Sequence, residues 1–228
     1  MGKTLALLVA LAAVGFAGCT VSDGTGEKTF TMSIEVQPGS PTPVAPLAWA
    51  VYTGSNPFFT LNTDSRINGL EPLAEDGNPA VAGGALSSLA AVSSRGVVDT
   101  PDGKSSPGPA LPGDTFTVTF TAAPGDTFSF ASMYGQSNDL FFSPVPDGIS
   151  LFSGDVPVSG DITDRIRLYD AGTEVNEEPG VGPNQAPRQA APNTGPDENG
   201  TVRLISDVSD GFSYPAVDGV IKVTVSSE

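Results

Sequence analysis

The sequence contains no histidine and only one cysteine, Cys19. The lack of histidine excludes Ser-His-Asp and Cys-His catalysis, histidine-bound zinc and the usual general base near neutral pH. With one cysteine no intramolecular disulfide can form, so the fold must be stable without covalent cross-links. No Walker loop, dinucleotide fingerprint or EF-hand loop pattern is present either. Any chemistry in this chain must therefore rest mainly on carboxylates.

Basic residues are also scarce. Lys and Arg total 10 against 26 Asp and Glu, which gives a formal net charge of −16. Such an acidic surface repels nucleic acid and anionic membranes, so neither is an expected direct partner. The composition suits a halophilic host and an ordinary acidic exported protein equally. A secreted hydrolase or carbohydrate-active enzyme with paired carboxylates, as in glycosidases, is the alternative function. Chance pairs are expected among 26 acids, and we predict no catalytic residue.

The chain lacks an apolar run long enough to span a bilayer. Lys3 precedes a short apolar stretch, Leu5–Ala13, which ends in small residues before Cys19. This pattern predicts a lipoprotein-type signal peptide over 1–18, with lipid attached to Cys19. The protein is then exported, anchored to the cell envelope and joined to the membrane only through its lipid. Ordinary secretion with a free Cys19 is the alternative. Residues 19–28 are predicted to form a flexible tether and 29–228 a single domain.

Alternating apolar and polar residues predict most of the fold. TFTMSIEV (29–36) places its apolar residues on one face, which is the period of a half-buried strand. TFTVTFT (115–121) and DTFSFASMY (126–134) alternate similarly, and the turn residues Pro124-Gly125-Asp126 between them predict an antiparallel hairpin. Further strands are predicted at Leu47–Tyr52, Ile149–Phe152, Arg165–Leu168, Thr201–Ile205 and Gly219–Val225.

Helical signals are few. Residues 79–92 are the best helix candidate, because Asn78 suits the N-cap and Pro79 the first helical position. Residues 96–113 are rich in Pro, Gly and Ser and indicate a loop. The sequence therefore predicts an all-β fold, an antiparallel β-sandwich of about eight strands with one or two short helices and long loops.

The residues from Ala171 to Gly200 contain too much Gly and Pro for a helix or a strand. A loop this long is usually functional or disordered. Asp170, Glu174, Glu177 and Glu178 lie within nine residues at its start, where their charges repel unless a cation or separation in water relieves them. Calcium is the natural cation, since it takes oxygen ligands in flexible geometry. We expect Glu177 and Glu178 to be exposed.

A second acidic loop lies around Asp139, which follows the strand predicted to end near Met133. Asp170 ends another predicted strand, and Gly172 lets the backbone turn so that Glu174 can reach the same point. If both loops emerge from the same end of the sandwich, these carboxylates converge on one ion. Asp139, Asp170 and Glu174 are therefore the predicted calcium ligands. The alternative is that all three are solvated loop acids of an acidic protein.

Three segments carry a family resemblance. LYDAGTEVNEEPGVGPNQAPRQ (168–189), SNDLFFSP (137–144) and LAEDGNP (73–79) resemble the bacterial members of the spondin N-terminal domain family. The resemblance spans roughly Phe30 to Val225 and departs from the family at Leu140, where many members carry Trp. It implies a calcium site at the loops that hold Asp139, Asp170 and Glu174. It also implies a cell-surface binding or adhesion role, toward a protein or glycan ligand that the sequence does not identify.

Overall fold

A computed structural model of the protein describes residues 1–2, 26–64 and 66–228. The predicted lipidation site Cys19, and all but the first two residues of the predicted signal segment, lie outside the described residues. Within them, no helix is both long and apolar enough to cross a membrane. The folded domain begins with strand β1 (Lys28–Val36), close to the predicted start of the domain.

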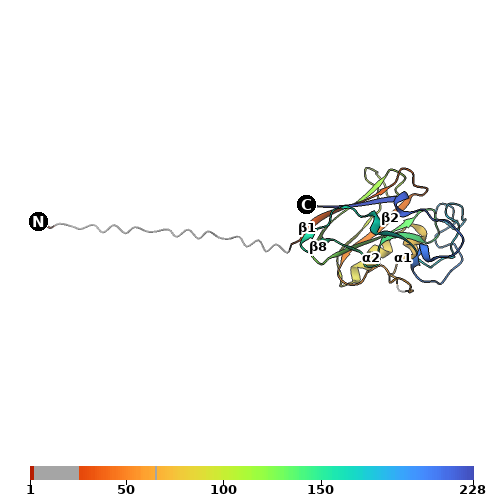
Figure 1. The fold of residues 1–228 in the computed structure, drawn as a ribbon, viewed down its shortest axis with the longest axis horizontal. Helices are drawn as coiled ribbons and strands as arrows, with labels where there is room; N and C mark the ends of the chain where they lie inside the picture. The colour runs from red at the N-terminus through yellow and green to blue at the C-terminus, as the bar shows by residue number, and fades with distance from the viewer. Residues whose placement is uncertain (3–25, 65) are drawn as a thin grey trace.

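Two antiparallel sheets pack face to face and confirm the predicted all-β sandwich (Figure 1). The smaller sheet has the strand order β10-β13-β1-β4, and the larger β12-β11-β6-β5-β2-β3, with β7 paired to β5. Strands β8 (Phe152–Ser153) and β9 (Val156–Pro157) form a separate small hairpin. The remaining strands are β2 (Val44–Tyr52), β3 (Val92–Val98), β4 (Thr115–Ala122), β5 (Thr127–Tyr134), β6 (Leu140–Pro144), β7 (Ile149–Ser150), β10 (Gly160–Asp161), β11 (Ile166–Asp170), β12 (Arg203–Leu204) and β13 (Ile221–Ser227).

The core between the sheets follows the predicted alternation. The inward residues of β1, which include Phe30 and Ile34, are fully buried. They pack with aromatic side chains of both sheets: Phe120 of β4 stacks on Phe128 of β5 with ring centroids 4.6 Å apart, and Trp49 of β2 lies 6.1 Å from Phe128. Rings that face each other across the sandwich bury large apolar areas, so this core is the main source of stability.

The predicted hairpin between β4 and β5 is wrong. β4 pairs with β1 in the smaller sheet, whereas β5 pairs with β2, β6 and β7 in the larger one. The turn residues are as predicted: Gly125 has a φ of +96°, and the Asp126 carboxylate accepts a 2.8 Å bond from the Ala123 N–H. Both strands bury aromatic faces, so the chain crosses from one sheet to the other and packs these faces together. Turn chemistry alone does not distinguish this crossing from a hairpin.

The helical prediction is correct only at its start. Helix α2 (Ala80–Ala85) and the 3₁₀ turn η1 (Leu86–Ser88) occupy the first part of residues 79–92. The chain then enters β3, which takes part of the predicted loop 96–113. A further helix, α1 (Leu70–Asp76), was not predicted. Both helices cover the outer face of the larger sheet (Figure 1), where Leu73 and Ala82 pack with Phe141 and Tyr169 in a second apolar cluster.

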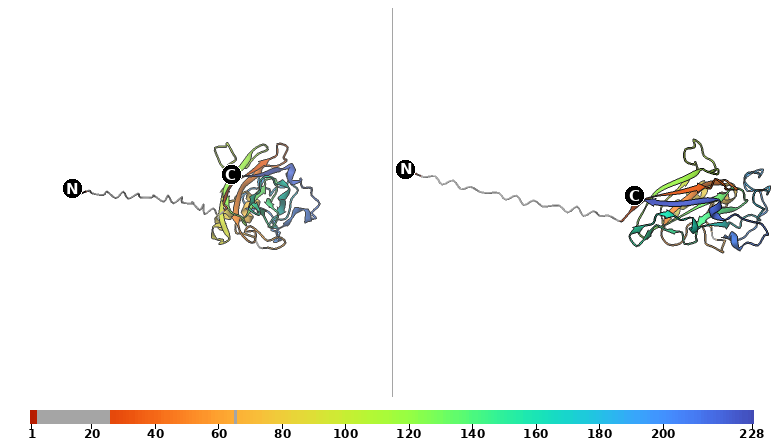
Figure 2. Two further views of the ribbon diagram at one scale, coloured as in Figure 1. Left: turned by 60° about the vertical axis from the view of Figure 1, so that its left-hand side comes forward. Right: turned by 45° about the horizontal axis from the view of Figure 1, so that its top comes forward.

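The long loop lies at the end of the sandwich away from the C-terminus (Figure 2). As predicted, no helix or strand forms between residues 171 and 200, although Glu174 and Asp197 make an isolated bridge. The loop leaves from the end of β11 and returns into β12, the strand that pairs with β11. Its two ends therefore meet, and they meet beside the start of β6. This junction contains the candidate site.

Candidate metal centre

Three neighbouring strands place their polar ends together. β11 lies between β6 and β12, with Asp170 opposite Leu140 on one side and Arg203 on the other. Asp139 directly precedes Leu140, so the sheet register brings it next to Asp170. Gly172 then turns the chain with a φ of +68°; a Cβ there would lie 2.5 Å from the Thr201 carbonyl oxygen. Glycine at this position is what lets the outgoing and returning ends of the loop run against each other.

The Asp139 side chain is fully buried, and only one of its two carboxylate oxygens accepts hydrogen bonds from the described residues. Its Oδ2 accepts bonds from the backbone N–H groups of Thr173, at 3.0 Å, and Glu174, at 3.2 Å. Its Oδ1 is buried and has no hydrogen-bond partner within the described part of the chain. An unpaired buried carboxylate oxygen costs the free energy of its lost hydration. This oxygen is therefore available to a proton or to a further ligand.

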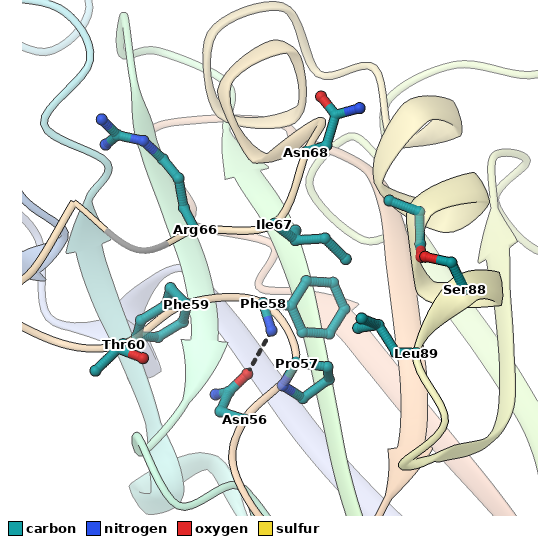
Figure 3. A pocket seen from close by; sticks show the side chains of 11 residues that line it. Asn56, Pro57, Phe58, Phe59, Thr60, Arg66, Ile67, Asn68, Ser88 and Leu89 are labelled. Atoms are coloured by element: carbon teal, nitrogen blue, oxygen red, sulfur yellow. Dashed lines mark hydrogen bonds between the residues drawn. The ribbon is translucent and has the colours of Figure 1, made fainter.

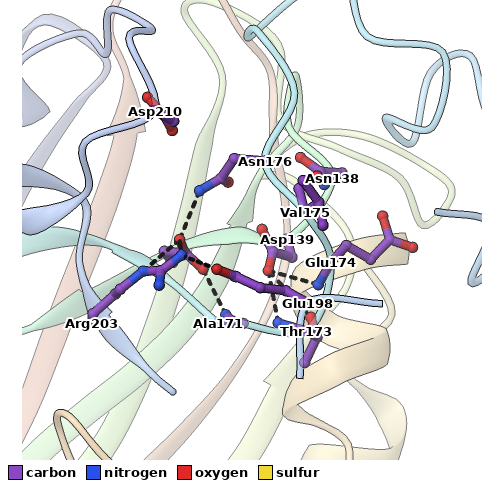
Figure 4. Close-up of polar contacts among 12 residues, drawn as sticks. Asn138, Asp139, Ala171, Thr173, Glu174, Val175, Asn176, Glu198, Arg203 and Asp210 are labelled. Atoms are coloured by element: carbon purple, nitrogen blue, oxygen red, sulfur yellow. Dashed lines mark hydrogen bonds and ion pairs between the residues drawn. The ribbon is translucent and has the colours of Figure 1, made fainter. Parts of the chain in front are cut away.

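Asp170 is also fully buried, but its bonds are complete. Oδ1 accepts from the Gly172 N–H at 2.6 Å, and Oδ2 accepts from Asn176 Nδ2 at 2.7 Å. Arg203 donates to the same Oδ2 from Nη2 at 2.7 Å, and its Nη2 also reaches Glu198 Oε1 at 2.6 Å (Figure 4). The guanidinium therefore links two carboxylates from opposite ends of the loop.

Glu198 completes the cluster. Asp139, Asp170 and Glu198 each offer a carboxylate oxygen, and these three oxygens lie within 4.8 Å of one another. Glu198 is held by its backbone, whose N–H donates to the Thr173 carbonyl at 2.9 Å. Its Oε2 is buried without a hydrogen-bond partner among the described residues. We call Asp139, Asp170, Glu198 and Arg203 the loop-end cluster.

The electrostatics of the cluster follow from burial. Burial raises the pKa of Asp139 well above its ordinary value, and the neighbouring Asp170 raises it further, against the lowering effect of the two backbone N–H donors. Burial opposes the charge of Arg203, but Glu198 and Asp170 together raise the pKa of its guanidinium. In the absence of a cation, the cluster therefore favours a proton on Asp139.

The structure places Glu174 beside this cluster but not in it. Its backbone N–H donates to Asp139, while its carboxylate points away from Asp139 (Figure 4) and lies against Gly195, where a Cβ would sit 2.3 Å from Oε2. The side chain is 1% exposed, and neither carboxylate oxygen has a hydrogen-bond partner among the described atoms. Of the predicted ligands, Asp139 and Asp170 come together, and Glu198 takes the place that Glu174 was predicted to fill.

A second buried carboxylate lies near Glu174. Glu75 of α1 is 2% exposed, and burial raises its pKa to about 7, with the Glu174 charge adding to the effect and the Thr173 hydroxyl opposing it. Burial likewise raises the pKa of Glu174 to about 7, and the neighbouring charge of Glu177 adds to the effect. This pair was not predicted, because nothing in the sequence brings α1 against the long loop.

The remaining acids of the loop differ from one another. Glu178 is exposed, as predicted. Glu177 is half-buried, and its carboxylate accepts bonds from the backbone and side chain of Asn184 at 3.0 and 2.6 Å. Arg188 donates to Gln136 at 3.0 Å rather than to the acidic cluster. These contacts hold the middle of the loop in place.

Sequence reasoning missed Glu198 and Arg203. One signal pointed to them: Glu198 precedes the predicted strand 201–205 and Arg203 lies within it, at the returning end of a loop whose outgoing end carries Asp170. A loop that leaves and re-enters one sheet brings its ends together only if the two strands are neighbours. The pairing of β11 with β12 supplies that condition, and a sequence does not reveal strand pairing.

The donor set suits a hard divalent cation. All its ligand atoms are oxygens, which calcium and magnesium prefer, and three carboxylates with one guanidinium leave two negative charges for the cation to balance. Asn176 Oδ1, also buried without a partner among the described residues, is a further oxygen beside Asp170. The arrangement can therefore bind a cation and tie the two ends of the loop to β6.

Another concavity, of about 330 Å³, lies beside α2 (Figure 3). Its walls are part apolar and part polar: Phe58, Ile67 and Leu89 lie around the opening, and Asn56 Oδ1 accepts a 2.9 Å bond from the Phe58 N–H. Arg66 is the one charged residue in its lining, and its guanidinium donates to the Ala171 carbonyl at 2.5 Å. This cavity presents no carboxylate and has no part in the metal centre.

No family model matches the chain, and a search of curated proteins likewise finds no match. The carboxylates at the loop end therefore carry the functional argument.

Proposed function

We propose that this protein is a cell-surface binding or adhesion module of spondin type, whose loop end is held in its working shape by one calcium ion. The cation binds the carboxylates of Asp139, Asp170 and Glu198, and Arg203 balances part of their charge. The role in binding rests on the resemblance of the long loop to the spondin domain and on the predicted lipid anchor at Cys19. Both are inferences from sequence.

The observation that carries the proposal is the unpaired oxygen of Asp139. Buried polar atoms without partners are rare in folded proteins. Seven buried side-chain N and O atoms lack a partner within the described chain. One is the Gln37 nitrogen, and the other six are oxygens of residues in or near the loop-end cluster: Glu75, Asp139, Glu174, Asn176 and Glu198. Near the loop end, all the unpaired atoms are oxygens, which accept hydrogen bonds. A cation would satisfy such oxygens, whereas another acceptor would not.

Calcium is favoured over other metals by the ligand types. The cluster contains no sulfur or imidazole, which excludes the sites typical of zinc and copper. Its ligands come from two loops and a strand end, so they can adjust to the variable geometry that calcium accepts and magnesium does not. Calcium would also make the proton on Asp139 unnecessary.

The test is thermal unfolding of the metal-stripped protein with added calcium or magnesium. A cation that binds only the folded state stabilises it by about 2.7 kcal/mol at a hundredfold excess over Kd. We expect calcium to raise the melting temperature and magnesium to do so less. Asp170→Asn should abolish the calcium effect, whereas Glu178→Gln, which changes an exposed acid of the same loop, should keep it. No calcium effect in the wild type would contradict the proposal.

A second function is favoured by one observation, the pair Glu75 and Glu174. Two buried carboxyls with pKa values of about 7 are the groups that an acid-base hydrolase needs, and Glu75 lines a polar cavity of about 290 Å³. A carbohydrate-active enzyme would show turnover on a polysaccharide and lose it in Glu75→Gln. A binding module would retain the same polymer without cleaving it. Product analysis after incubation with a panel of polysaccharides separates the two.

A further inference from the structure

An apolar cavity of about 610 Å³ opens beside the long loop, apart from the loop-end cluster. It lies between the start of β2, the end of α1, the segment after β3, the end of β5 and the middle of the long loop. Met133, which is 1% exposed, and Ala45 line it together with six prolines from four separate segments: Pro43, Pro46, Pro79, Pro107, Pro109 and Pro187.

Proline and close backbone contacts restrict the walls of the cavity. Each proline has a fixed φ and presents a flat apolar ring face. Gly77 and Gly135 bring the wall segments into contact: a Cβ at Gly77 would lie 2.8 Å from Ala45 Cβ, and one at Gly135 would lie 2.8 Å from the Pro43 carbonyl oxygen. A preformed cavity loses little conformational freedom on binding. Its volume is in the range of about 300–1,000 Å³ that small-molecule sites occupy.

Two carboxylates give the lining of this cavity a negative charge. Asp76 and Asp99 both line it, and neither forms an ion pair with any cation in the described chain. Asp76 Oδ1 accepts from Gln189 Nε2 at 2.8 Å, and Asp99 Oδ1 accepts from Thr100 Oγ1 at 2.8 Å. These neutral donors leave both negative charges uncompensated. With a net charge of −16, the protein as a whole also attracts cations and repels anions.

We propose that this cavity binds a small organic cation, with an apolar ring-sized body between the prolines and an ammonium or guanidinium group at Asp76 and Asp99. The inference rests on the proposed role as a binding module and names the chemistry of a ligand. It does not require calcium, because none of the loop-end cluster lines the cavity. The long loop supplies Ala186 and Pro187 to one wall, so an ordered loop should tighten binding.

The test uses three molecules of one shape: 4-phenylbutylamine, 4-phenylbutanol and 4-phenylbutyrate. Each is titrated into the protein while backbone amide shifts are followed by NMR. We expect saturable binding of the amine at least tenfold tighter than of the alcohol, and no binding of the carboxylate. The shifts should concentrate on Gly77, Gly108 and Gly135, which line the cavity. Equal binding of amine and alcohol, or any saturable binding of the carboxylate, would overturn the inference.

Two matched variants test whether the charge of Asp99 contributes to amine binding. Asp99→Asn changes an exposed acid at the cavity and should weaken amine binding at least fivefold without affecting folding. Asp155→Asn changes an equally exposed acid in the turn between β8 and β9, outside the cavity, and should leave binding unchanged. If the two variants bind the amine with equal affinity, the charge of Asp99 does not contribute to binding and the inference fails.

Two further arms separate this result from other outcomes. The titrations are run in EDTA and in calcium: amine binding in either condition supports the cavity, while the effect of calcium alone on the same samples reports the loop-end cluster. A peptide, acetyl-Phe-Arg-amide, is titrated in parallel. Saturable binding of the peptide with none of the amine would overturn the small-molecule proposal and assign the cavity to a basic protein segment.

Discussion

The middle of the sandwich and its loop end are buried in different ways. Between the sheets, aromatic and branched side chains from both sides fill the space, and backbone groups are paired along the strands. At the loop end, Asp139, Asp170 and Glu174, with exposures of 0–1%, lie among backbone turns, and their oxygens include three of the seven unpaired buried side-chain atoms of the described chain. The first region is filled by its own apolar side chains. The second holds three carboxylates against the single guanidinium of Arg203.

This difference explains why the loop can be long and still ordered. Its two ends are tied to the sheet by Arg203 and by the backbone donors on Asp139, and its middle by the contacts of Glu177 with Asn184. The charges that hold the ends together also repel one another. Under our proposal, a divalent cation would relieve that repulsion and link the two ends of the loop.

The largest expected effect on the free energy of unfolding comes from a substitution in the core that leaves the loop end unchanged. Phe128 is fully buried against Trp49 and Phe120, so Phe128→Ala should lower the free energy of unfolding by about 3–5 kcal/mol. Phe212→Ala, at a side chain 36% exposed, should change it far less. Denaturant unfolding in EDTA and in calcium should give the same loss for Phe128→Ala. A loss that calcium repairs would show that the two regions are not independent.

Next in size is the removal of Arg203. Arg203→Gln leaves Asp170 buried without its ion pair and should cost about 3 kcal/mol in EDTA. Calcium should recover part of this loss, because it supplies positive charge to the same carboxylates. Arg95→Gln, an exposed residue of β3 with no ion pair in the described chain, is the control and should change little. An equal loss for Arg203→Gln with and without calcium would count against the cation.

A gain of stability is expected from Glu75→Gln. The pKa of Glu75 is raised to about 7, so the folded state holds its proton more tightly than the unfolded chain does. The stability from this proton is present in full below the ordinary pKa of about 4.5 and is lost as the pH rises through about 7. In EDTA at pH 8 the variant should therefore be more stable than the wild type by about 1–3 kcal/mol.

Near pH 4 the two proteins should unfold alike, since Glu75 is then protonated in both states. Glu71→Gln, on the exposed side of the same helix, should follow the wild type at every pH. Urea unfolding at several pH values measures the difference. A Glu75→Gln variant that is less stable than the wild type at pH 8 would mean that the charged form has a cation partner even in EDTA.

The smallest effect concerns salt. A net charge of −16 destabilises the compact state by self-repulsion, and the screening length falls from about 10 Å at 0.1 M to about 3 Å at 1 M salt. The melting temperature in EDTA should rise by a few degrees between these NaCl concentrations. The rise should be smaller in calcium, which already relieves the repulsion at the loop end. A flat or falling curve in EDTA would show that surface charge does not limit stability.

The parts of the fold that sequence predicted are those set by local pattern. The alternation of β1, β4 and β5 placed their apolar faces correctly, and the density of Gly and Pro correctly marked the long loop. What failed depended on pairing between distant segments. The turn at Gly125 has residues typical of a hairpin but connects strands of different sheets. Helix α1 follows Gly69 and has no side-chain N-cap from which the sequence could predict it.

The candidate site shows the same division. Asp170 was found because it ends a predicted strand, and Asp139 because it lies in the loop after the strand predicted to end near Met133. The prediction required both loops to emerge from the same end of the sandwich, and the pairing of β6 with β11 brings the two residues together. Glu174 lies on the right loop, but the turn at Gly172 aims its carboxylate away from the other two (Figure 4). Glu198 reaches the cluster only through the pairing of β11 with β12. No local pattern encodes that pairing.

The central claim is that the loop end is completed by calcium, and calorimetric titration of the wild type, Asp139→Asn and Glu178→Gln tests it most directly. Asn at 139 keeps an oxygen for the two backbone donors and places an amide where the unpaired oxygen lies. We predict one saturable calcium site in the wild type and in Glu178→Gln, and none in Asp139→Asn. In EDTA, Asp139→Asn should nevertheless melt above the wild type, because it removes a buried carboxyl group that the folded protein can hold only by taking up a proton. No saturable binding in the wild type, or equal losses in the two variants, would contradict the account.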